Sequence, residues 1–215
     1  QFSMKKKIKK NIIVLYHNNC PDGFGAVWSA WKKFGKKAEY VGVDDRRNFL
    51  SRLKGKEIYI LDFGYSPDLT KRLKQQTKSI VLVDHHISSK DSLKVATEYM
   101  FDVKHSGAVL SWKYFHPNKK VPNALRCIED MDLGKFHKKK SASFVQFLMT
   151  QEKDFKTWSR VIQHWEADAA FRHHAFEIGT TLIDYQDHIV NAMMEHAYEV
   201  AFEGEKVYAV NINVH

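Results

Sequence analysis

Four short runs of apolar residues in the N-terminal half have the pattern of buried β-strands. They cover residues 12–16, 40–43, 58–61 and 80–83, and they are rich in β-branched side chains. None of them alternates apolar with polar positions, as a strand with one face in water would do. Continuous apolar runs of this length are typical of strands that are buried on both faces. The pattern therefore predicts four strands of a parallel sheet.

Amphipathic segments separate these runs. Between residues 26 and 34 the apolar positions fall on one face of a helix, and Gly35 is suited to end it. Ser66 and Pro67 are a suitable N-cap and first residue for a helix that continues to residue 76. Strands that alternate with helices predict an α/β fold, with a doubly wound, mostly parallel sheet and helices on both of its faces.

After residue 105 the pattern becomes mostly helical, so we expect a helical segment to follow the sheet. The predicted helices cover residues 107–115, 122–129, 143–150, 155–165 and 170–202. Residues 206–215 then have a strand-like pattern. Because a single strand needs a partner, this last run either joins the sheet or begins a second lobe.

The composition is that of an ordinary globular protein. The 215 residues are 44% hydrophobic, which provides for a sizeable core and excludes a disordered or collagen-like chain. Cys20 and Cys127 are too few for a disulfide scaffold, and no apolar run has the length of a membrane span. We therefore expect a cytoplasmic protein without a membrane partner. Residues 1–3, which precede Met4, are expected to be an expression scar.

The chain is strongly basic. It contains 34 Lys and Arg residues against 25 Asp and Glu residues, which gives a net charge of +9. Such a charge favours polyanionic partners such as nucleotides and nucleic acids. A basic protein without any such partner is the alternative interpretation.

Acidic or imidazole side chains directly follow three of the predicted strands. His17, Cys20 and Asp22 come after the first run, Asp62 after the third, and Asp84-His85-His86 after the fourth. Ligands of open α/β sheets bind at the carboxyl ends of the strands, and neighbouring strands lie about 4.8 Å apart. Carboxylates and imidazoles that meet there suit Mn²⁺, Mg²⁺ or Zn²⁺. An Asp after a strand can instead cap the next helix, but capping does not explain three such strand ends.

These residues resemble the motifs of a known enzyme superfamily. Three segments are similar to the first three motifs of the DHH phosphoesterases: residues 17–23, Asp62, and Asp84-His85-His86, in this order. Ser106-Gly107-Ala108 resembles the small-residue segment that follows the DHH strand. The acidic segment 129–132 stands where the fourth motif is expected. The resemblance covers most of residues 11–205 and implies a DHH-type domain over residues 4–205, with 206–215 as the beginning of a truncated C-terminal lobe.

The resemblance implies a dinuclear Mn²⁺ or Mg²⁺ centre and a role for each matching residue. The implied metal ligands are His17, Asp22, Asp62, His85 and Asp130, with Asp132 as the alternative to Asp130. His86 would face the substrate phosphate, and Asp84 would orient it. Phosphate contacts are expected from Gly23, in a turn at residues 23–25 that opens the first helix, and from Ser106 and Gly107.

Cys20 departs from the pattern, because most of the superfamily has an acid two residues before Asp22. A thiol is a poor partner for hard Mn²⁺ or Mg²⁺. One metal position is therefore expected to be weak or rebuilt around His17, with Cys20 as a possible ligand or as a neighbour of the ligands. The alternative is that Cys20 is only a small buried residue.

The implied activity is metal-dependent hydrolysis of phosphodiester bonds in short oligonucleotides or nucleotide-like substrates. A nucleotide or a single-stranded oligonucleotide is the implied partner, as for RecJ-type exonucleases and the phosphodiesterases of this superfamily. Two alternatives stay open. One is a phosphomonoesterase or pyrophosphatase that acts on small phosphates. The other is a non-catalytic relative that binds nucleic acid, in which Cys20 marks the loss of the centre.

Overall fold

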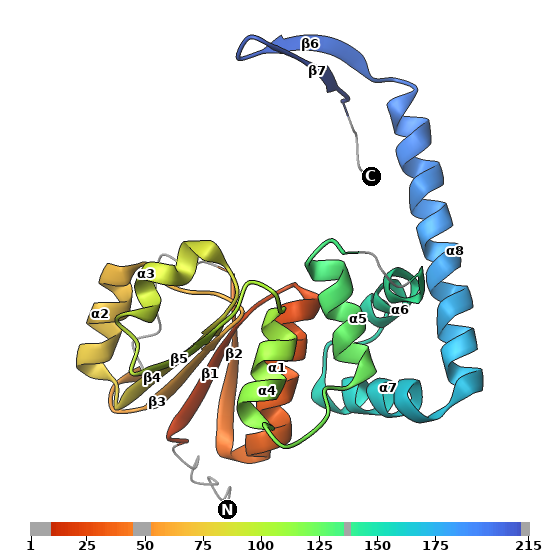
Figure 1. Ribbon diagram of the computed structural model, residues 1–215. Coiled ribbons are helices and arrows are strands. Elements are labelled where there is room, and N and C mark those ends of the chain that lie inside the picture. Colours follow the sequence, from red (N-terminus) through yellow and green to blue (C-terminus); the bar gives the residue numbers. More distant parts are fainter. Residues whose placement is uncertain (1–9, 45–52, 136–138, 212–215) are drawn as a thin grey trace, which may run out of the picture.

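The computed structural model describes residues 10–44, 53–135 and 139–211. The expected scar at residues 1–3 lies outside them. A five-stranded sheet forms the centre of the molecule (Figure 1). Its strands are β1 (Ile12–His17), β2 (Ala38–Val43), β3 (Glu57–Leu61), β4 (Ser79–Asp84) and β5 (Glu98–Phe101).

The strand order is β2-β1-β3-β4-β5, and every neighbouring pair is parallel. The four predicted strands are confirmed. The sequence did not predict β5, because this edge strand is short and partly exposed and therefore has no continuous apolar run. The chain moves outward in one direction from β1 to β2 and in the other from β3 to β5. The sheet consequently has a switch point between β1 and β3, where ligands of such folds bind.

Helices cover both faces of the sheet, which confirms the predicted doubly wound α/β fold (Figure 1). On one face α1 (Pro21–Phe34) and α4 (Gly107–Phe115) pack against alternate strand residues such as Val14 and Val83. On the other face α2 (Pro67–Gln76) and the short α3 (Lys90–Leu93) pack against the intervening strand residues. Both faces of each central strand are thus buried, as the continuous apolar runs require.

The ends of the first two helices follow the predicted signals. Pro21 is the first residue of α1, and the chain leaves this helix at Gly35, whose φ of 52° favours glycine. Ser66 caps α2, since its hydroxyl accepts a hydrogen bond from the backbone N–H of Leu69 at 3.4 Å. The short 3₁₀-helices η1 (Gly35–Lys37) and η3 (Ile87–Ser89) follow α1 and β4.

A helical segment follows the sheet, as predicted. It consists of α5 (Asn123–Asp132), α6 (Lys139–Met149), α7 (Phe155–Ala167) and α8 (Ala169–Met194). The first three extend the core on the α1 and α4 side, where the ring of Trp158 lies 4.7 Å from that of Phe24. At Gly179, α8 crosses α6 so closely that a Cβ atom would meet the carbonyl oxygen of Ser143. No helix in the described ranges has both the length and the apolar character of a membrane span.

The helix predicted over residues 170–202 is wrong in its last part. It ends at Met194, and residues 198–202 form β6 (Tyr198–Phe202), which pairs antiparallel with β7 (Glu205–Ala209). The turn between them places Glu203 and Gly204 at positive φ, as a tight hairpin requires. The last strand therefore pairs within a hairpin rather than with the sheet. The expected boundary between residues 205 and 206 falls inside β7.

Candidate metal centre at the carboxyl ends of the strands

Three adjacent strands end at the same level and bring the predicted residues together. Tyr16 of β1 is in register with Leu61 of β3, which is in register with Val83 of β4. The next residue along each strand is His17, Asp62 and Asp84, and His85 and His86 follow directly. The parallel register therefore explains why side chains far apart in the sequence converge at one edge of the sheet.

Five of the predicted residues form one cluster, with Asp62 and His85 at its centre. The ring nitrogen Nδ1 of His17 lies 3.3 Å from Oδ2 of Asp62, and Nε2 of His85 lies 3.3 Å from Oδ1 of the same carboxylate. Nε2 of His85 also lies 3.7 Å from Oδ2 of Asp22 and 3.5 Å from Oδ2 of Asp132. The donors thus converge from five elements of the fold, namely the ends of β1, β3 and β4 and the helices α1 and α5.

Several atoms of this cluster are buried without a hydrogen bond to the described residues. They are Nδ1 of His17, both carboxylate oxygens of Asp62, Oδ2 of Asp84 and Nε2 of His85. The side chain of Asp62 is only 1% exposed. Since buried polar atoms are rarely left without partners, these atoms indicate a ligand. Imidazole nitrogens and carboxylate oxygens together suit a divalent cation.

The electrostatics of the cluster lead to the same conclusion. Burial and the charge of Asp62 raise the pKa of Asp22 well above its usual range. Burial also acts to raise the pKa of Asp62, but the rings of His17 and His85 outweigh it, and this pKa lies at about 2. Burial acts to lower the pKa of His85, but Asp62 and Asp132 outweigh it and raise this pKa. A divalent cation would relieve the repulsion between the carboxylates.

The carboxylate of Asp62 is held in place by its own backbone and by α4. Its φ of 63° is unusual for a residue other than glycine, and its N–H donates to the carbonyl of Val83 at 2.9 Å. A Cβ atom at Gly107 would lie 2.5 Å from Oδ1 of Asp62, so only glycine fits beside this carboxylate. The sparsely populated conformation at Asp62 is the kind of strain found at functional sites.

Asp22 joins the first residues of two helices. Its side chain projects from the first turn of α1 and accepts hydrogen bonds from the backbone N–H groups of Gly107, at 2.6 Å, and Ala108, at 2.9 Å. The positive end of α4 therefore faces this carboxylate. The hydroxyl of Ser106 is buried and accepts a hydrogen bond from Val109. The phosphate-binding roles of Ser106 and Gly107 stay predictions, because these groups already have protein partners.

Gly23 serves close packing. The turn expected at residues 23–25 is wrong, since these residues lie inside α1. A Cβ atom at Gly23 would lie 2.0 Å from the carbonyl oxygen of His17. Glycine at this position lets the start of α1 approach the end of β1, and Asp22 in the first turn of α1 reaches the cluster, 3.7 Å from His85. A contact between Gly23 and phosphate stays a prediction.

The two adjacent histidines differ in their surroundings. His85 points into the cluster, whereas Nδ1 of His86 lies 2.7 Å from Oδ1 of Asp84. The same oxygen of Asp84 accepts hydrogen bonds from the backbone N–H groups of His85 and His86, at 2.8 and 3.3 Å. Asp84 is completely buried, and His86 is 37% exposed. This arrangement suits the predicted orienting role of Asp84, which stays a prediction.

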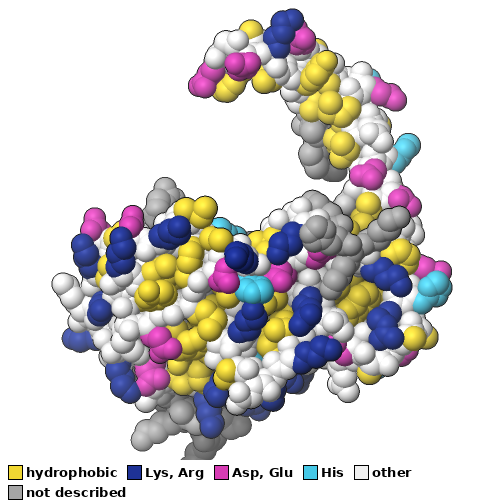
Figure 2. Space-filling view, viewed as in Figure 1, with side chains coloured by type: hydrophobic (Ala, Val, Ile, Leu, Met, Phe, Trp, Pro, Cys, Tyr) yellow, Lys and Arg dark blue, Asp and Glu magenta, His cyan; other side chains and the backbone are white. Residues whose placement is uncertain are grey.

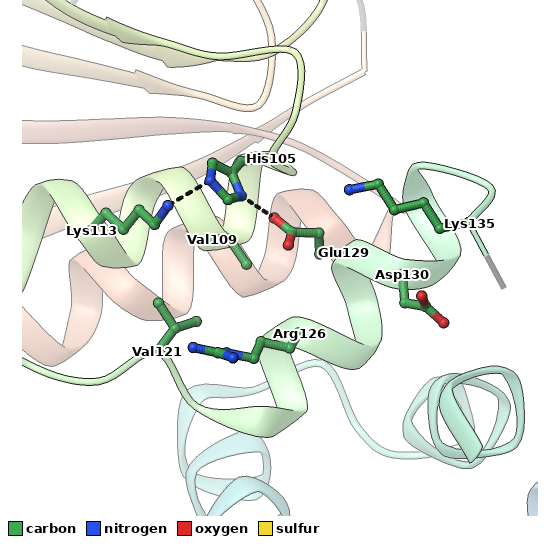
Figure 3. Close-up of a pocket in the computed structure, with 8 residues that line it drawn as sticks. All are labelled: His105, Val109, Lys113, Val121, Arg126, Glu129, Asp130 and Lys135. Carbon is green, nitrogen blue, oxygen red and sulfur yellow. Dashed lines mark hydrogen bonds and ion pairs between the residues drawn. The ribbon is translucent and has the colours of Figure 1, made fainter. Parts of the chain in front are cut away.

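The structure places Asp132 in the cluster and does not place Asp130 there. Consecutive residues of a helix are about 100° apart, so two residues separated by one other face nearly opposite sides. Asp132 of α5 lies 3.5 Å from His85. Asp130 is buried and turns away from the neighbouring pair of His105 and Glu129 in Figure 3. The geometry thus favours the alternative over the preferred fourth-motif ligand.

His105 and Glu129 form a pair that the sequence reasoning missed. Glu129 accepts a hydrogen bond from the backbone N–H of Ser106 at 3.0 Å, and Nδ1 of His105 lies 2.9 Å away (Figure 3). Both border a cavity of about 320 Å³ between α4 and α5, together with Val109, Lys113, Val121, Arg126, Asp130 and Lys135. Lys and Arg side chains gather over these helices in Figure 2.

Cys20 lies at the edge of the cluster. Its sulfur, a ring nitrogen of His17 and a carboxylate oxygen of Asp62 are all within 4.8 Å of one another. Burial raises the pKa of the Cys20 thiol to about 11, the N–H of Gly23 opposes this rise, and the acids Asp62 and Asp22 add to it. Beside the thiol is a mostly apolar cavity of about 200 Å³, whose lining also includes Pro21, Asp22, Ile128, Met131, Asp132 and Val145.

Comparisons with known proteins support the fold and leave the activity open. No protein-family model matches the chain. The chain is 25% identical over 200 residues to an uncharacterized protein of Acanthamoeba polyphaga mimivirus; the match covers 85% of this chain and 46% of the viral protein. The chain thus spans about half the length of this relative. The crystal structure of an uncharacterized protein from Helicobacter pylori G27 matches 91% of this chain and 73% of that one, with a TM-score of 0.57 and 13% identity.

Proposed function

We propose that this protein is a metal-dependent phosphoesterase that hydrolyses phosphodiester bonds in short oligonucleotides or nucleotide-like substrates. The observation that carries the proposal is the convergence of buried donor atoms of His17, Asp62 and His85, which make no hydrogen bond within the described residues, at the carboxyl ends of β1, β3 and β4. Together with Asp22 and Asp132, these residues would hold two divalent cations. Mn²⁺ or Mg²⁺ suits the oxygen-rich part of this donor set.

The order of these residues supports a relationship to the DHH phosphoesterases. Their resemblance rests on short motifs that lie far apart in the sequence, and such motifs gain weight when they meet in one site. Each motif lies at the end of one of three neighbouring strands. His17 and Asp22 come at or after the end of β1, Asp62 follows β3, and Asp84-His85-His86 comes at the end of β4. This arrangement is what a common site built from these motifs would need.

The chain's own residues suggest how the reaction would be supported. When bound, divalent cations at such a site polarise a phosphoryl oxygen and lower the pKa of a water molecule. Asp84 can only accept at Oδ1 when ionised, so Nδ1 of His86 carries the proton of that hydrogen bond. The other ring nitrogen, Nε2, then gains a proton only when the imidazole becomes charged. In that form His86 would donate to a phosphoryl oxygen and stabilise its negative charge.

The charge of the chain supports a polyanionic substrate. The net charge is +9, and basic side chains gather over α4 and α5, beside the elements that carry the cluster (Figure 2). Positive potential of this kind raises the local concentration of polyanions. A cytoplasmic location is part of the same proposal, because neither Cys20 nor Cys127 forms a disulfide, as is usual in a reducing compartment.

Hydrolysis by metal-stripped and reloaded protein tests the proposed function. The substrates are short single-stranded oligonucleotides and a chromogenic phosphodiester, each with Mn²⁺, Mg²⁺ or Zn²⁺. Asp62→Asn is expected to lower turnover roughly 1,000-fold, since the cations supply several kcal/mol of transition-state stabilisation. Asp91→Asn is the matched control, because this exposed acid pairs only with Lys94 among the described interactions and should leave turnover unchanged.

The alternatives predict different outcomes of the same experiment. Turnover of phosphomonoesters or pyrophosphate without turnover of diesters would indicate the small-phosphate enzyme. The replacement of a carboxylate by Cys20 favours a non-catalytic nucleic-acid-binding protein as the second candidate. In that case oligonucleotides would bind equally well to the parent protein and to Asp62→Asn, and no metal would produce turnover.

A further inference from the structure

We infer that Cys20 supplies a thiolate ligand to one of two metal positions and makes that position selective for zinc-like ions, while the other position takes harder ions such as Mn²⁺. The inference rests on the proposed function only in assuming that the cluster binds divalent cations. It replaces a uniform dinuclear centre by one with two chemically different positions.

The cluster divides into two sets of donors. His17, Cys20 and Asp62 form the first set, and Asp22, His85 and Asp132 form the second; in each set the candidate ligand atoms lie within 4.8 Å of one another. A third group, which consists of Asp62, Asp84, His85 and His86, overlaps both sets and connects them. Asp62 lies between the two. Its Oδ2 is 3.3 Å from His17 and its Oδ1 is 3.3 Å from His85, so its two oxygens face the two sets.

The first set indicates a ligand independently of the cysteine. Nδ1 of His17 and both oxygens of Asp62 are buried and make no hydrogen bond within the described part of the chain. The carboxylate of Asp62 is almost completely removed from water, and the unusual φ of this residue holds it toward the cluster. His17 and His85 stabilise this buried carboxylate, and a cation held between these side chains would take over that stabilisation.

The chemistry of the donors separates the two positions. Thiolate, imidazole and carboxylate are the three ligand types that zinc takes, at about 2.0–2.3 Å, so that tetrahedral ligand atoms lie about 3.3–3.8 Å apart. The ligand atoms of His17, Cys20 and Asp62 lie within 4.8 Å of one another, and those of His17 and Asp62 are 3.3 Å apart. The second set has two carboxylates and one imidazole, which suit Mn²⁺ or Mg²⁺ better than a thiolate does.

Formation of the sulfur–metal bond requires the thiol to lose its proton. The bond that breaks is S–H, the bond that forms is S–Zn, and one proton passes to the solvent. The sulfur is accessible for this step, because Cys20 is only partly buried and borders the 200 Å³ cavity. Cys127 is buried in the core among apolar residues and provides the matched control.

Cobalt(II) spectroscopy of the full chain tests this bond. Metal-stripped protein is titrated with Co²⁺, whose thiolate complexes have an intense sulfur-to-metal charge-transfer band in the near ultraviolet. We expect this band in the parent protein and in Cys127→Ala, and its loss in Cys20→Ser. Circular dichroism of each variant verifies that the fold is kept.

The outcomes separate this inference from the proposed function. Cobalt d–d bands without a charge-transfer band in the parent protein would overturn the thiolate ligand and leave a metal centre in place. A charge-transfer band that persists in Cys20→Ser and vanishes in Cys127→Ala would also overturn it. If no cobalt binds, the inference and the proposed function both fail.

Alkylation provides a second measurement that needs no substitution. Iodoacetamide labelling of Cys20 is followed by mass spectrometry, with Zn²⁺ or Mg²⁺ at equal concentrations. Since a metal-bound thiolate is a weaker nucleophile than a free one, Zn²⁺ should slow the labelling by about tenfold or more. Mg²⁺ should leave the rate unchanged. Equal protection by the two ions would contradict the selectivity.

Discussion

In most proteins polar groups face water and large apolar side chains are buried. The carboxyl ends of the strands and the C-terminal hairpin both depart from this pattern, in opposite directions. At the strand ends, both carboxylate oxygens of Asp62 are buried without a hydrogen bond. In the hairpin of β6 and β7, Phe202 is 63% exposed and Tyr208 is 74% exposed. One region removes polar groups from water, and the other leaves large apolar groups in water.

The two departures differ in how much they cost. An exposed aromatic side chain loses only its own burial energy, whereas a buried ionisable group without a partner carries a desolvation penalty. In the described part of the chain, the ionisable side-chain atoms that are buried without a hydrogen bond belong to His17, Asp62, Asp84 and His85. Their gathering in one place distinguishes this end of the sheet as the candidate site for a divalent cation.

Divalent metal should have the largest effect on stability, because it would bind the buried polar atoms at the strand ends. A cation at 100 times its dissociation constant stabilises the fold by about 2.7 kcal/mol. We therefore expect Zn²⁺ or Mn²⁺ to raise the thermal unfolding midpoint of the parent protein. The same addition should have little effect on Asp62→Asn. Equal stabilisation of both proteins would place the cation elsewhere.

Gly107→Ala tests the same region by steric means. The new Cβ atom would lie 2.5 Å from Oδ1 of Asp62, which must move or distort the start of α4. Such overpacking costs about 1–3 kcal/mol, and metal binding should weaken with it. Gly64→Ala is the control, because its Cβ atom would meet the hydroxyl of Ser89 instead, at 2.6 Å. Chemical denaturation and metal titration of both variants measure the two effects.

If Gly107→Ala bound metal as tightly as Gly64→Ala does, Asp62 would not be a ligand. The loss of stability in both variants would then be explained by overpacking alone. A loss of metal binding in Gly107→Ala alone would show that the position of the carboxylate matters beyond stability.

His116 provides a contrast to the cluster at the strand ends, because it is a buried ionisable group that does have a hydrogen-bond partner. Burial lowers its pKa, and the hydrogen bond of Nε2 to the carbonyl of Ser29, at 3.0 Å, only partly opposes this. Lys119, Lys33 and Lys32 lower this pKa further. The unfolded chain therefore binds a proton more readily, so the stability that His116 contributes is complete above about pH 6.5 and is lost as the pH falls below it.

Unfolding measured at neutral pH and at mildly acidic pH checks this sign. The loss of stability on acidification should be smaller for His116→Gln than for the parent protein, because glutamine does not titrate and can still donate to Ser29. An identical loss in both proteins would assign the pH dependence to other groups. The effect is expected to be smaller than those of metal and of Gly107→Ala.

The hairpin should give the smallest effect. Phe202→Ser and Tyr208→Ser remove exposed rings, and surface substitutions of this kind usually change stability by less than about 0.5 kcal/mol. The unfolding midpoint should therefore stay constant, while binding of a hydrophobic dye should fall. A clear loss of stability would mean that the hairpin contributes to the core and that the two regions are not opposites.

Local patterns predicted the elements that depend on local chemistry. The central strands β1, β3 and β4 are evident because burial on both faces demands continuous apolar runs. The edge strand β2 is mostly half-buried but still has an apolar run. The edge strand β5 has no such demand. The sequence predicts helix for Tyr198–Phe202, because this segment continues the apolar spacing of α8, and only pairing with β7 decides for a strand.

The candidate site was predictable as far as the strands position it. His17, Asp62 and His85 belong to strand ends, so their convergence follows from a parallel sheet. The contribution of α5 depends on the rotation of that helix against the sheet, which selects Asp132 rather than Asp130. The sequence could not indicate this rotation, because both acids lie in the same short acidic segment.

The sequence by itself determined the type of sheet, the strand ends at which chemistry gathers and the kinds of donor present there. Only the tertiary structure decided that Gly23 and Gly107 serve close approach, that Asp22 is held by the N–H groups of α4, and that Cys20 joins His17 and Asp62 in one set. The physical reason is distance. Periodicity reports the burial of each segment, whereas ligand sets form between segments whose separation is settled by packing.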